Sequence, residues 1–181
     1  MTARERALKA AVSVVADLGF QALTHAKVDA TAKLPPGSTS NYFRTKDALV
    51  SGLIRHIADQ EMSNGGGSLA AKTPEELVEK IGGLILALTT VRRELTAARM
   101  AIFLSGKHAG EIRDSFAEGA AFFHRELVAT FTELGAADPH SAASALMSCA
   151  EGIILHRLTW DADPDPLPQL ALVVKGALAS S

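Results

Sequence analysis

The stretch from Thr24 to Leu49 most constrains the fold, because two consecutive prolines interrupt a helical pattern in its middle. Pro35 and Pro36 disfavour helical geometry in the residues before them, so a helix that begins after Thr24 must end near Ala32. Thr24 is placed to cap that helix with its hydroxyl. Pro36 can open a second short helix, since the first helical position needs no backbone N–H. The pattern therefore predicts two short helices joined by a tight turn.

The residues after the turn are small and polar, Gly37-Ser38-Thr39-Ser40-Asn41-Tyr42, and Phe43 follows them as an apolar anchor. Such side chains contribute little to a core, but they can hydrogen-bond to base edges and phosphates. A helix, a tight turn and a polar helix form the layout of a helix-turn-helix reader, whose second helix enters the major groove. An exposed connecting loop between two bundle helices fits the same pattern equally well.

Four segments within the first sixty residues carry a further similarity: Gly19-Phe20, Thr24, Val28 to Leu34, and Gly37 to Leu49. In residue type and spacing they resemble the N-terminal domain of the TetR family of bacterial transcriptional regulators. The resemblance implies DNA binding, with phosphate contacts from Tyr42 and Lys46, which match the family's pattern.

Three residues depart from the pattern of that family. The family usually has Gly where this chain has Lys33, and a non-glycine residue there needs a left-handed backbone. It often has Tyr where this chain has Ser40 and His where this chain has Asn41. The base contacts of the family are therefore not transferred to these positions.

We expect the DNA interface to combine base contacts, which specify, with phosphate contacts, which position. The expected base-reading residues are Ser38, Thr39 and Asn41. The expected phosphate-binding residues are Thr24, Lys27, Tyr42 and Lys46. Lys46 opens the next helix, so its side chain and the helix dipole can act on one phosphate.

The distribution of charge agrees with a phosphate-binding head. Residues 1–60 hold eight Lys and Arg residues against five Asp and Glu, a net charge of +3. The remainder therefore carries −5 in a chain whose formal net charge is −2. A basic end on an acidic body suits a protein that binds a polyanion.

Apolar residues recur at helical spacing through the chain, and no stretch alternates as a strand would. We therefore predict an all-α protein with a three-helix helix-turn-helix head on a helical-bundle body. The predicted domains are a DNA-binding domain (1–46), a connector helix (47–62), a flexible linker around three consecutive glycines (63–72) and a ligand-binding and dimerisation domain (73–181). The predicted helices outside the turn region cover about 3–18, 46–62, 74–90, 94–105, 111–134 and 138–158, and a last helix opens at Pro166 or Pro168 and runs to about 179.

The helix predicted over 138–158 is apolar on two sides, with Leu146 and Ile153 on one and Met147 and Ile154 on the other. A helix of this kind is buried on more than one side, and one side can face another subunit. The family resemblance implies a homodimer joined through the last two helices. Two identical heads would read a palindromic operator in double-stranded DNA.

The resemblance also implies a pocket in the body for a small molecule, which we expect to be largely apolar. Large, soft side chains and a histidine are the candidate lining, although ordinary core packing explains each residue alone as well. These candidates are Met100, Phe103, Phe116, Phe123, His124, Met147 and Trp160.

Several other functions lack a sequence signal. No two of the six histidines have the spacing of a metal site, and the single Cys149 excludes an internal disulfide. There is no G-x-S-x-G elbow and no glycine-rich phosphate loop. We therefore expect no catalytic residues, no metal and no cofactor, and an enzyme is not predicted.

The apolar runs are short of the ~20 residues that span a bilayer, and the N-terminus lacks an apolar signal core. We expect a cytoplasmic protein without membrane association. The predicted function is a ligand-responsive transcriptional regulator, foremost a repressor that a small molecule releases from its operator. The alternatives are a helical protein-interaction module without DNA binding and a small-molecule hydrolase or carrier.

Overall fold

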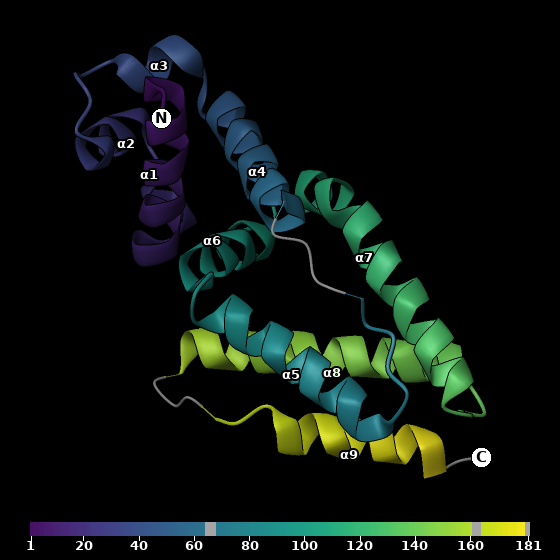
Figure 1. The fold of residues 1–181 in the computed structure, drawn as a ribbon. Coiled ribbons are helices and arrows are strands. Elements are labelled where there is room, and N and C mark those ends of the chain that lie inside the picture. The colour runs from purple at the N-terminus through teal and green to yellow at the C-terminus, as the bar shows by residue number, and fades with distance from the viewer. Residues whose placement is uncertain (64–67, 161–163, 180–181) are drawn as a thin grey trace. The chain divides into compact units, whose positions relative to one another are not determined.

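The computed structural model describes residues 1–63, 68–160 and 164–179, and all regular structure in these ranges is helical. The predicted all-α fold is confirmed for the described residues. The helices, shown in Figure 1, are α1 (Ala3–Leu18), η1 (Phe20–Ala22), α2 (His25–Ala32), α3 (Ser38–Tyr42), α4 (Lys46–Ser63), α5 (Pro74–Thr89), α6 (Arg93–Leu104), α7 (Ala109–Glu133), α8 (Pro139–Thr159) and α9 (Leu167–Ala179).

Four of these helices begin at a capping side chain, and one of the four, Thr24, is the predicted cap. Thr24, Thr45, Thr73 and Asp138 each accept a hydrogen bond from the backbone N–H three residues later, over 3.0 to 3.2 Å. Each bond satisfies an N–H group that has no partner within its helix. These signals are local, so they fix the helix starts without knowledge of the fold.

The start of α3 differs from the prediction. Pro36 lies in the turn, and Gly37 precedes the helix with a φ of 88° and a ψ of −6°. This left-handed conformation, which glycine adopts without steric cost, redirects the chain before Ser38 begins the helix.

The chain folds into two compact units, and neither is a continuous segment. The N-terminal unit consists of Met1–Gly65 and Glu94–Ala117, and the C-terminal unit consists of Gly66–Arg93 and Glu118–Ser181. Residues 94–117, expected to belong to the body, therefore pack with the N-terminal helices. The predicted functional boundaries at 46, 62 and 72 stay a prediction.

The core of the N-terminal unit joins α1, α2, α4, α6 and the start of α7. Leu49, Leu53 and Ile57, which recur every four residues along α4, are fully buried. Ala98 and Ile102 of α6 are fully buried in the same core. The remaining large members of this core are Leu8, Val12, Val15, Phe20, Leu23, Val28, Phe43, Val50, Ile54 and Ile112.

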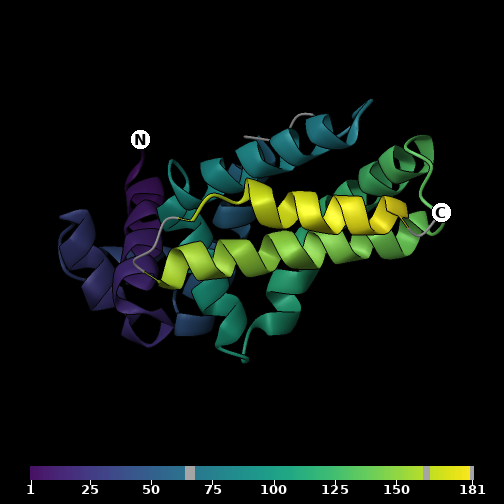
Figure 2. The same cartoon turned by 90° about the horizontal axis from the view of Figure 1, so that it is seen from below.

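In the C-terminal unit, α5, α8 and α9 lie side by side (Figures 1 and 2). On α8, Leu146 and Ile153 are buried, whereas Leu155 is 39% exposed. The other large buried residues of this unit are Leu77, Ile81, Ile85, Leu127, Phe131, Ile154, Leu170 and Val174.

Two arginines fix the end of α8 within this unit. Arg93 donates to the carbonyl oxygens of Arg157 and Leu158 over 2.9 and 3.1 Å. The buried Arg157 donates from Nε to the hydroxyl of Thr89 over 2.8 Å. The bonds from Arg93 satisfy carbonyl groups that the end of a helix leaves without partners, and the bond from Arg157 to Thr89 ties α8 to α5.

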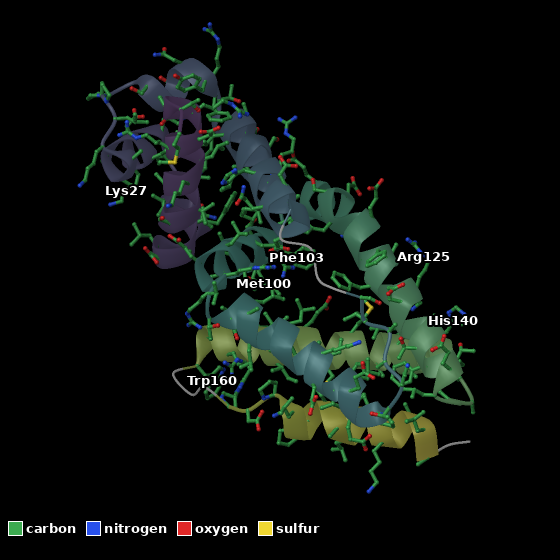
Figure 3. The ribbon with its side chains drawn as sticks, viewed as in Figure 1. Lys27, Met100, Phe103, Arg125, His140 and Trp160 are labelled. Carbon is green, nitrogen blue, oxygen red and sulfur yellow. The ribbon has the colours of Figure 1, made fainter. Side chains whose placement is uncertain are left out.

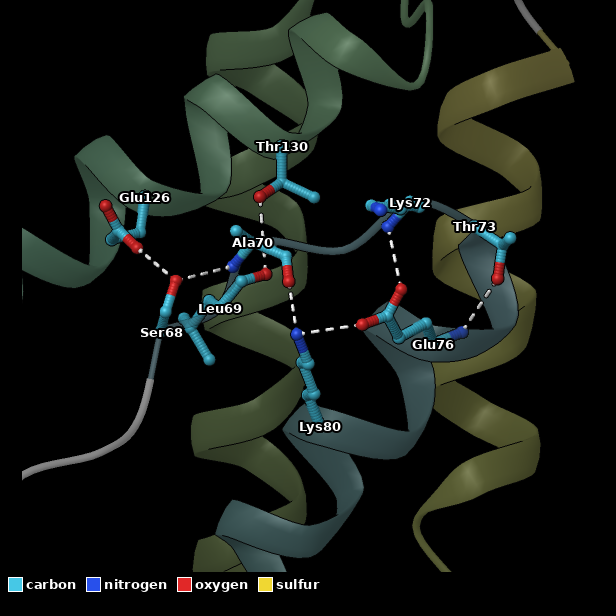
Figure 4. Close-up of polar contacts among 9 residues, drawn as sticks. All are labelled: Ser68, Leu69, Ala70, Lys72, Thr73, Glu76, Lys80, Glu126 and Thr130. Carbon is cyan, nitrogen blue, oxygen red and sulfur yellow. Dashed lines mark hydrogen bonds and ion pairs between the residues drawn. The ribbon is translucent and has the colours of Figure 1, made fainter.

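The segment 68–72 is anchored, although the sequence predicts a flexible linker over 63–72 (Figure 4). Leu69 and Ala71 are buried, and the hydroxyl of Thr130 donates to the Leu69 carbonyl over 3.3 Å. Ser68 donates to Glu126 over 3.2 Å. The run Gly65 to Gly67 predicts flexibility only for those three residues. They fall within 64–67, outside the described residues.

A close contact within the N-terminal unit gives a test of the packing. A Cβ added at Gly52 of α4 would lie 2.5 Å from Cε1 of the Phe43 ring. We expect Gly52→Ala to lower the free energy of unfolding by about 1–3 kcal/mol, because a buried ring must move. Urea unfolding followed by circular dichroism measures this change.

Gly83 of α5 provides the matched control, since a Cβ there would meet nothing within 4 Å. Gly83→Ala should raise the free energy of unfolding by about 0.5–1 kcal/mol through the better helix propensity of alanine. Equal effects of the two substitutions would contradict the tight contact between Gly52 and Phe43.

Candidate nucleic-acid interface

A single carboxylate on α2 holds α3 in place. Asp29 is 4% exposed and accepts hydrogen bonds from the backbone N–H groups of Gly37 and Thr39, both over 2.8 Å. The hydroxyl of Thr39 donates to the same carboxylate. A helix as short as α3 is not stable on its own, so its orientation on α2 depends on this group of bonds.

These bonds also set the charge of Asp29. Burial raises the pKa of this carboxyl, but the hydrogen bonds from Thr39 and Gly37 outweigh burial and lower it below the ordinary value of 3.8. Bonds to the charged form stabilise that form. Asp29 is therefore a carboxylate at neutral pH.

The turn before α3 contains the left-handed residue that the sequence predicts. Lys33 has φ 53° and ψ 45°, and it is the one non-glycine residue with positive φ among the described residues. The N–H of Leu34 bonds to the Asp29 carbonyl over 2.9 Å, which ends α2. Arg6 of α1 donates to the carbonyls of Ala32 and Lys33 over 2.7 and 3.1 Å. The guanidinium thus ties the turn to α1, a role that local sequence did not indicate.

The end of α3 is fixed as well. Phe43 is 5% exposed, which confirms its predicted role as the anchor of this segment. Its carbonyl lies 2.6 Å from Nε2 of His25 at the start of α2, and the Arg4 guanidinium lies 5.4 Å from the centre of its ring.

Most of the predicted DNA-binding side chains lie on the surface around α3. Thr24, Lys27, Asn41, Tyr42 and Lys46 are exposed, and Figure 3 labels Lys27 on α2. The side chain of Asn41 makes no hydrogen bond to another described residue. These groups are available to a partner, while the backbone that carries them is held from both ends.

Two of the predicted base-reading residues are engaged within the protein. Thr39 is fully buried with its hydroxyl bonded to Asp29, which contradicts its predicted base contact. Ser38 is half-buried and its hydroxyl donates to the Pro35 carbonyl over 2.6 Å. A local pattern identifies a short polar helix but not which of its sides faces the neighbouring helix, so it could not separate Thr39 from Asn41.

Lys46 lies at the N-terminus of α4, where its Nζ is 5.6 Å from the centre of the Phe20 ring. The ammonium group thus makes a cation–π contact with the ring, and the residue stays exposed. Two other exposed cations near α3 in the sequence, Lys33 and Arg44, were not among the predicted contacts.

Three of the predicted ligand-pocket residues belong to the N-terminal unit. Met100 and Phe103 lie on α6 (Figure 3), where Met100 is half-buried and Phe103 is 44% exposed. Phe116 of α7 is half-buried under the guanidinium of Arg99, which lies 5.5 Å from its ring centre.

The other four residues belong to the C-terminal unit. Phe123 and Met147 are half-buried, and Nε2 of His124 lies 3.4 Å from the Ser144 hydroxyl. Trp160 is 65% exposed and stacks on His156, with ring centres 5.2 Å apart. An open groove of about 750 Å³ between α5 and α9 is lined by none of the seven residues.

Across the described residues, no three His, Cys, Asp or Glu side chains are grouped as a metal site would need. Nor does any described helix combine the length and the apolar character that crossing a membrane requires.

Comparison with known families finds one match over more than half of the chain. The sequence model described as "Tetracyclin repressor-like, C-terminal domain" matches residues 72–180. The HTH-type transcriptional regulator BetI of Brucella melitensis biotype 2 is 25% identical over 173 residues, covering 94% of this chain and 87% of that protein.

Solved structures share the fold of this chain. A transcriptional regulator from Rhodococcus sp. Rha1 shares the fold with a TM-score of 0.80 at 17% identity, covering 99% of this chain and 97% of that one. The multidrug binding protein EbrR, solved in complex with ethidium, is 25% identical with a TM-score of 0.66, covering 95% of this chain and 96% of that one.

The hydrogen bonds of Asp29 predict a dependence of stability on pH. Because the pKa of Asp29 is lowered in the folded protein, its contribution is complete above the ordinary value near 4 and is lost as pH falls below it. We expect Asp29→Asn to lower the free energy of unfolding by about 1–3 kcal/mol at neutral pH. This difference from the wild type should shrink between about pH 5 and pH 3, as measured by urea unfolding.

Asp114→Asn on the exposed side of α7 is the control for that series. It should leave the free energy of unfolding within about 0.5 kcal/mol of the wild type. A pH-independent difference between Asp29→Asn and the wild type would argue against a charged, hydrogen-bonded Asp29.

The left-handed backbone of Lys33 predicts that glycine is preferred there. Lys33→Gly should be more stable than Lys33→Ala by about 1 kcal/mol, since both remove the charge and only glycine avoids the steric cost of this conformation. Thermal unfolding of the two variants measures the difference, and equal stabilities would show that position 33 carries no strain.

Proposed function

The chain belongs to the TetR family of DNA-binding transcriptional regulators, and on that premise we propose that it is a homodimeric repressor that a small molecule releases from a palindromic operator. A transcriptional regulator of this family is not an enzyme, so the function rests on binding equilibria.

The observation that carries this proposal is the contrast between the two sides of α3. Its inner side is fixed by Asp29 through Thr39, whereas Asn41 and Tyr42 are exposed and α4 begins nearby with Lys46. A short, rigidly held helix with exposed polar groups suits insertion into the major groove.

We assign base contacts and phosphate contacts with DNA to different residues. Asn41 is the principal base-reading residue, because an asparagine amide can donate to and accept from an adenine edge. Ser38 is a second candidate, provided that its hydroxyl exchanges the Pro35 carbonyl for a base. The phosphate contacts come from Thr24, Lys27, Tyr42 and Lys46.

The dimer would form through α8 and α9. Leu155 of α8 is 39% exposed and Leu172 of α9 is 73% exposed, and apolar side chains of this size are commonly covered by a partner. A two-fold interface uses the same surface of both subunits, so the two heads would meet two half-sites of opposite orientation.

The ligand would be small and largely apolar, and EbrR, whose complex with ethidium is known, supplies a first probe. Candidate contacts are Met100, Phe103 and Phe116 in the N-terminal unit and Phe123, His124, Met147 and Trp160 in the C-terminal unit. A ligand that binds better to the conformation with low DNA affinity shifts the population toward it and so releases the operator.

Sequencing of genomic fragments that bind the purified protein at two salt concentrations tests this function. A palindromic sequence whose recovery falls steeply with salt is the expected result. Release of that duplex by a small molecule that does not itself bind DNA tests the ligand-responsive part. Ethidium, which intercalates into duplexes, is titrated against the protein without DNA. A helical protein-interaction module would recover no sequence and show no salt-dependent affinity for DNA.

Lys46 provides a test of the phosphate contacts. Lys46→Ala should weaken binding to specific and random duplexes by a similar factor, because phosphates are present in every sequence. It should also reduce the slope of log affinity against log salt by about 1 for each phosphate that Lys46 neutralises. Fluorescence anisotropy titrations at several salt concentrations measure both quantities.

Lys72→Ala removes an exposed lysine from the C-terminal unit and is the control. It should leave affinity and salt slope unchanged. If Lys46→Ala weakened binding to the operator alone and left the salt slope intact, Lys46 would be a base contact and the phosphate assignment would be wrong.

A further inference from the structure

The turn between α6 and α7 reaches the N-terminus of α4 within the N-terminal unit. Nζ of Lys107 lies 2.8 Å from Oδ1 of Asp47, the second residue of α4. His108 follows with its side chain 10% exposed, its Nε2 3.8 Å from the same oxygen and its ring edge-on to Phe20 at 5.7 Å. His108 in this turn and Lys46 of α4 therefore contact the same ring, that of Phe20.

Asp47 is an unfavourable neighbour for a bound phosphate. It directly follows Lys46, and its carboxylate lies in the first turn of the helix whose free N–H groups would face the anion. A carboxylate there favours the helix but repels a phosphate. The hydrogen bond and charge of Lys107 lower the pKa of Asp47, so this carboxyl is charged at neutral pH.

The pair between Lys107 and Asp47 contributes little to folding. The two side chains are 66% and 65% exposed, and ion pairs in such surroundings stabilise proteins only slightly. The pair does, however, place a positive charge against the carboxylate that directly follows Lys46. Its effect should therefore appear in DNA binding rather than in stability.

We propose that Lys107 is a positioning residue of the DNA interface, which neutralises Asp47 and thereby allows Lys46 and the N-terminus of α4 to bind phosphate. This inference rests on the proposed function. Because Lys107 belongs to the turn between α6 and α7, any movement of that turn away from α4 would leave the Asp47 charge uncompensated. DNA affinity would fall without a change in α3.

A double-mutant cycle on the full chain tests this proposal, with a short random-sequence duplex at low ionic strength as the probe. Lys107→Gln should weaken binding roughly three- to tenfold, which corresponds to one uncompensated charge near a phosphate. Asp47→Asn should bind at least as tightly as the wild type. The double variant should match Asp47→Asn, because without the carboxylate there is nothing for Lys107 to neutralise.

Lys107→Arg should restore wild-type affinity, since it keeps the charge at the same position. Thermal unfolding of all variants should differ little, which separates this role from a structural one.

Three outcomes would overturn the inference. Unchanged affinity of Lys107→Gln would show that the pair is irrelevant to DNA. An equal loss on substituting Lys107 in the wild type and in Asp47→Asn would show that Lys107 acts on DNA independently of Asp47. A folded wild-type protein that binds no duplex would contradict the proposed function itself, and this inference with it.

Discussion

The proposed DNA-reading surface depends on one buried carboxylate. Asp29 accepts hydrogen bonds from two backbone N–H groups at the start of α3 and from the hydroxyl of Thr39. It thus satisfies donors that a five-residue helix could not satisfy itself. A buried charge is tolerated only where hydrogen bonds replace its hydration. The same bonds turn Thr39 inward and leave Asn41 and Tyr42 exposed. The position of one side chain on α2 thus decides which residues of α3 can meet a partner.

The turn that precedes α3 is held by a side chain of α1, that of Arg6. Lys33 adopts a conformation that costs about 1–2 kcal/mol for a residue with a side chain. Arg6 supports the strained turn by donating to the carbonyls on either side of the bend, from a helix 26 residues earlier in the chain. Asp29 and Arg6 together hold the turn and the five-residue helix after it in place.

Local signals predicted the helices of this chain well, because a capping side chain and the apolar spacing act within a few residues of one another. Thr24 caps its helix as predicted, and Thr45, Thr73 and Asp138 are residues of the same kind at helix starts. Leu49, Leu53 and Ile57 recur at helical spacing and are buried.

Contacts between distant segments were not predictable in the same way. Thr39 bonds to Asp29, Arg6 bonds to the carbonyls of the turn, and Lys107 pairs with Asp47. Each of these contacts joins residues that no local pattern connects. The anchoring of 68–72 was missed for the same reason, since it depends on Thr130 and Glu126 of α7.

The interleaving of the two units has a consequence for recombination between relatives. The chain passes between the units at 65/66, 93/94 and 117/118, and Ala98, Ile102 and Ile112 complete a core that is otherwise built from the first sixty residues. A chimaera that exchanged only the N-terminal helices would set three foreign side chains against that core. With α3 as the proposed reading helix, new DNA specificity is therefore easier to acquire by substitutions on its exposed side than by exchange of the whole head, unless α6 and the start of α7 are exchanged with it.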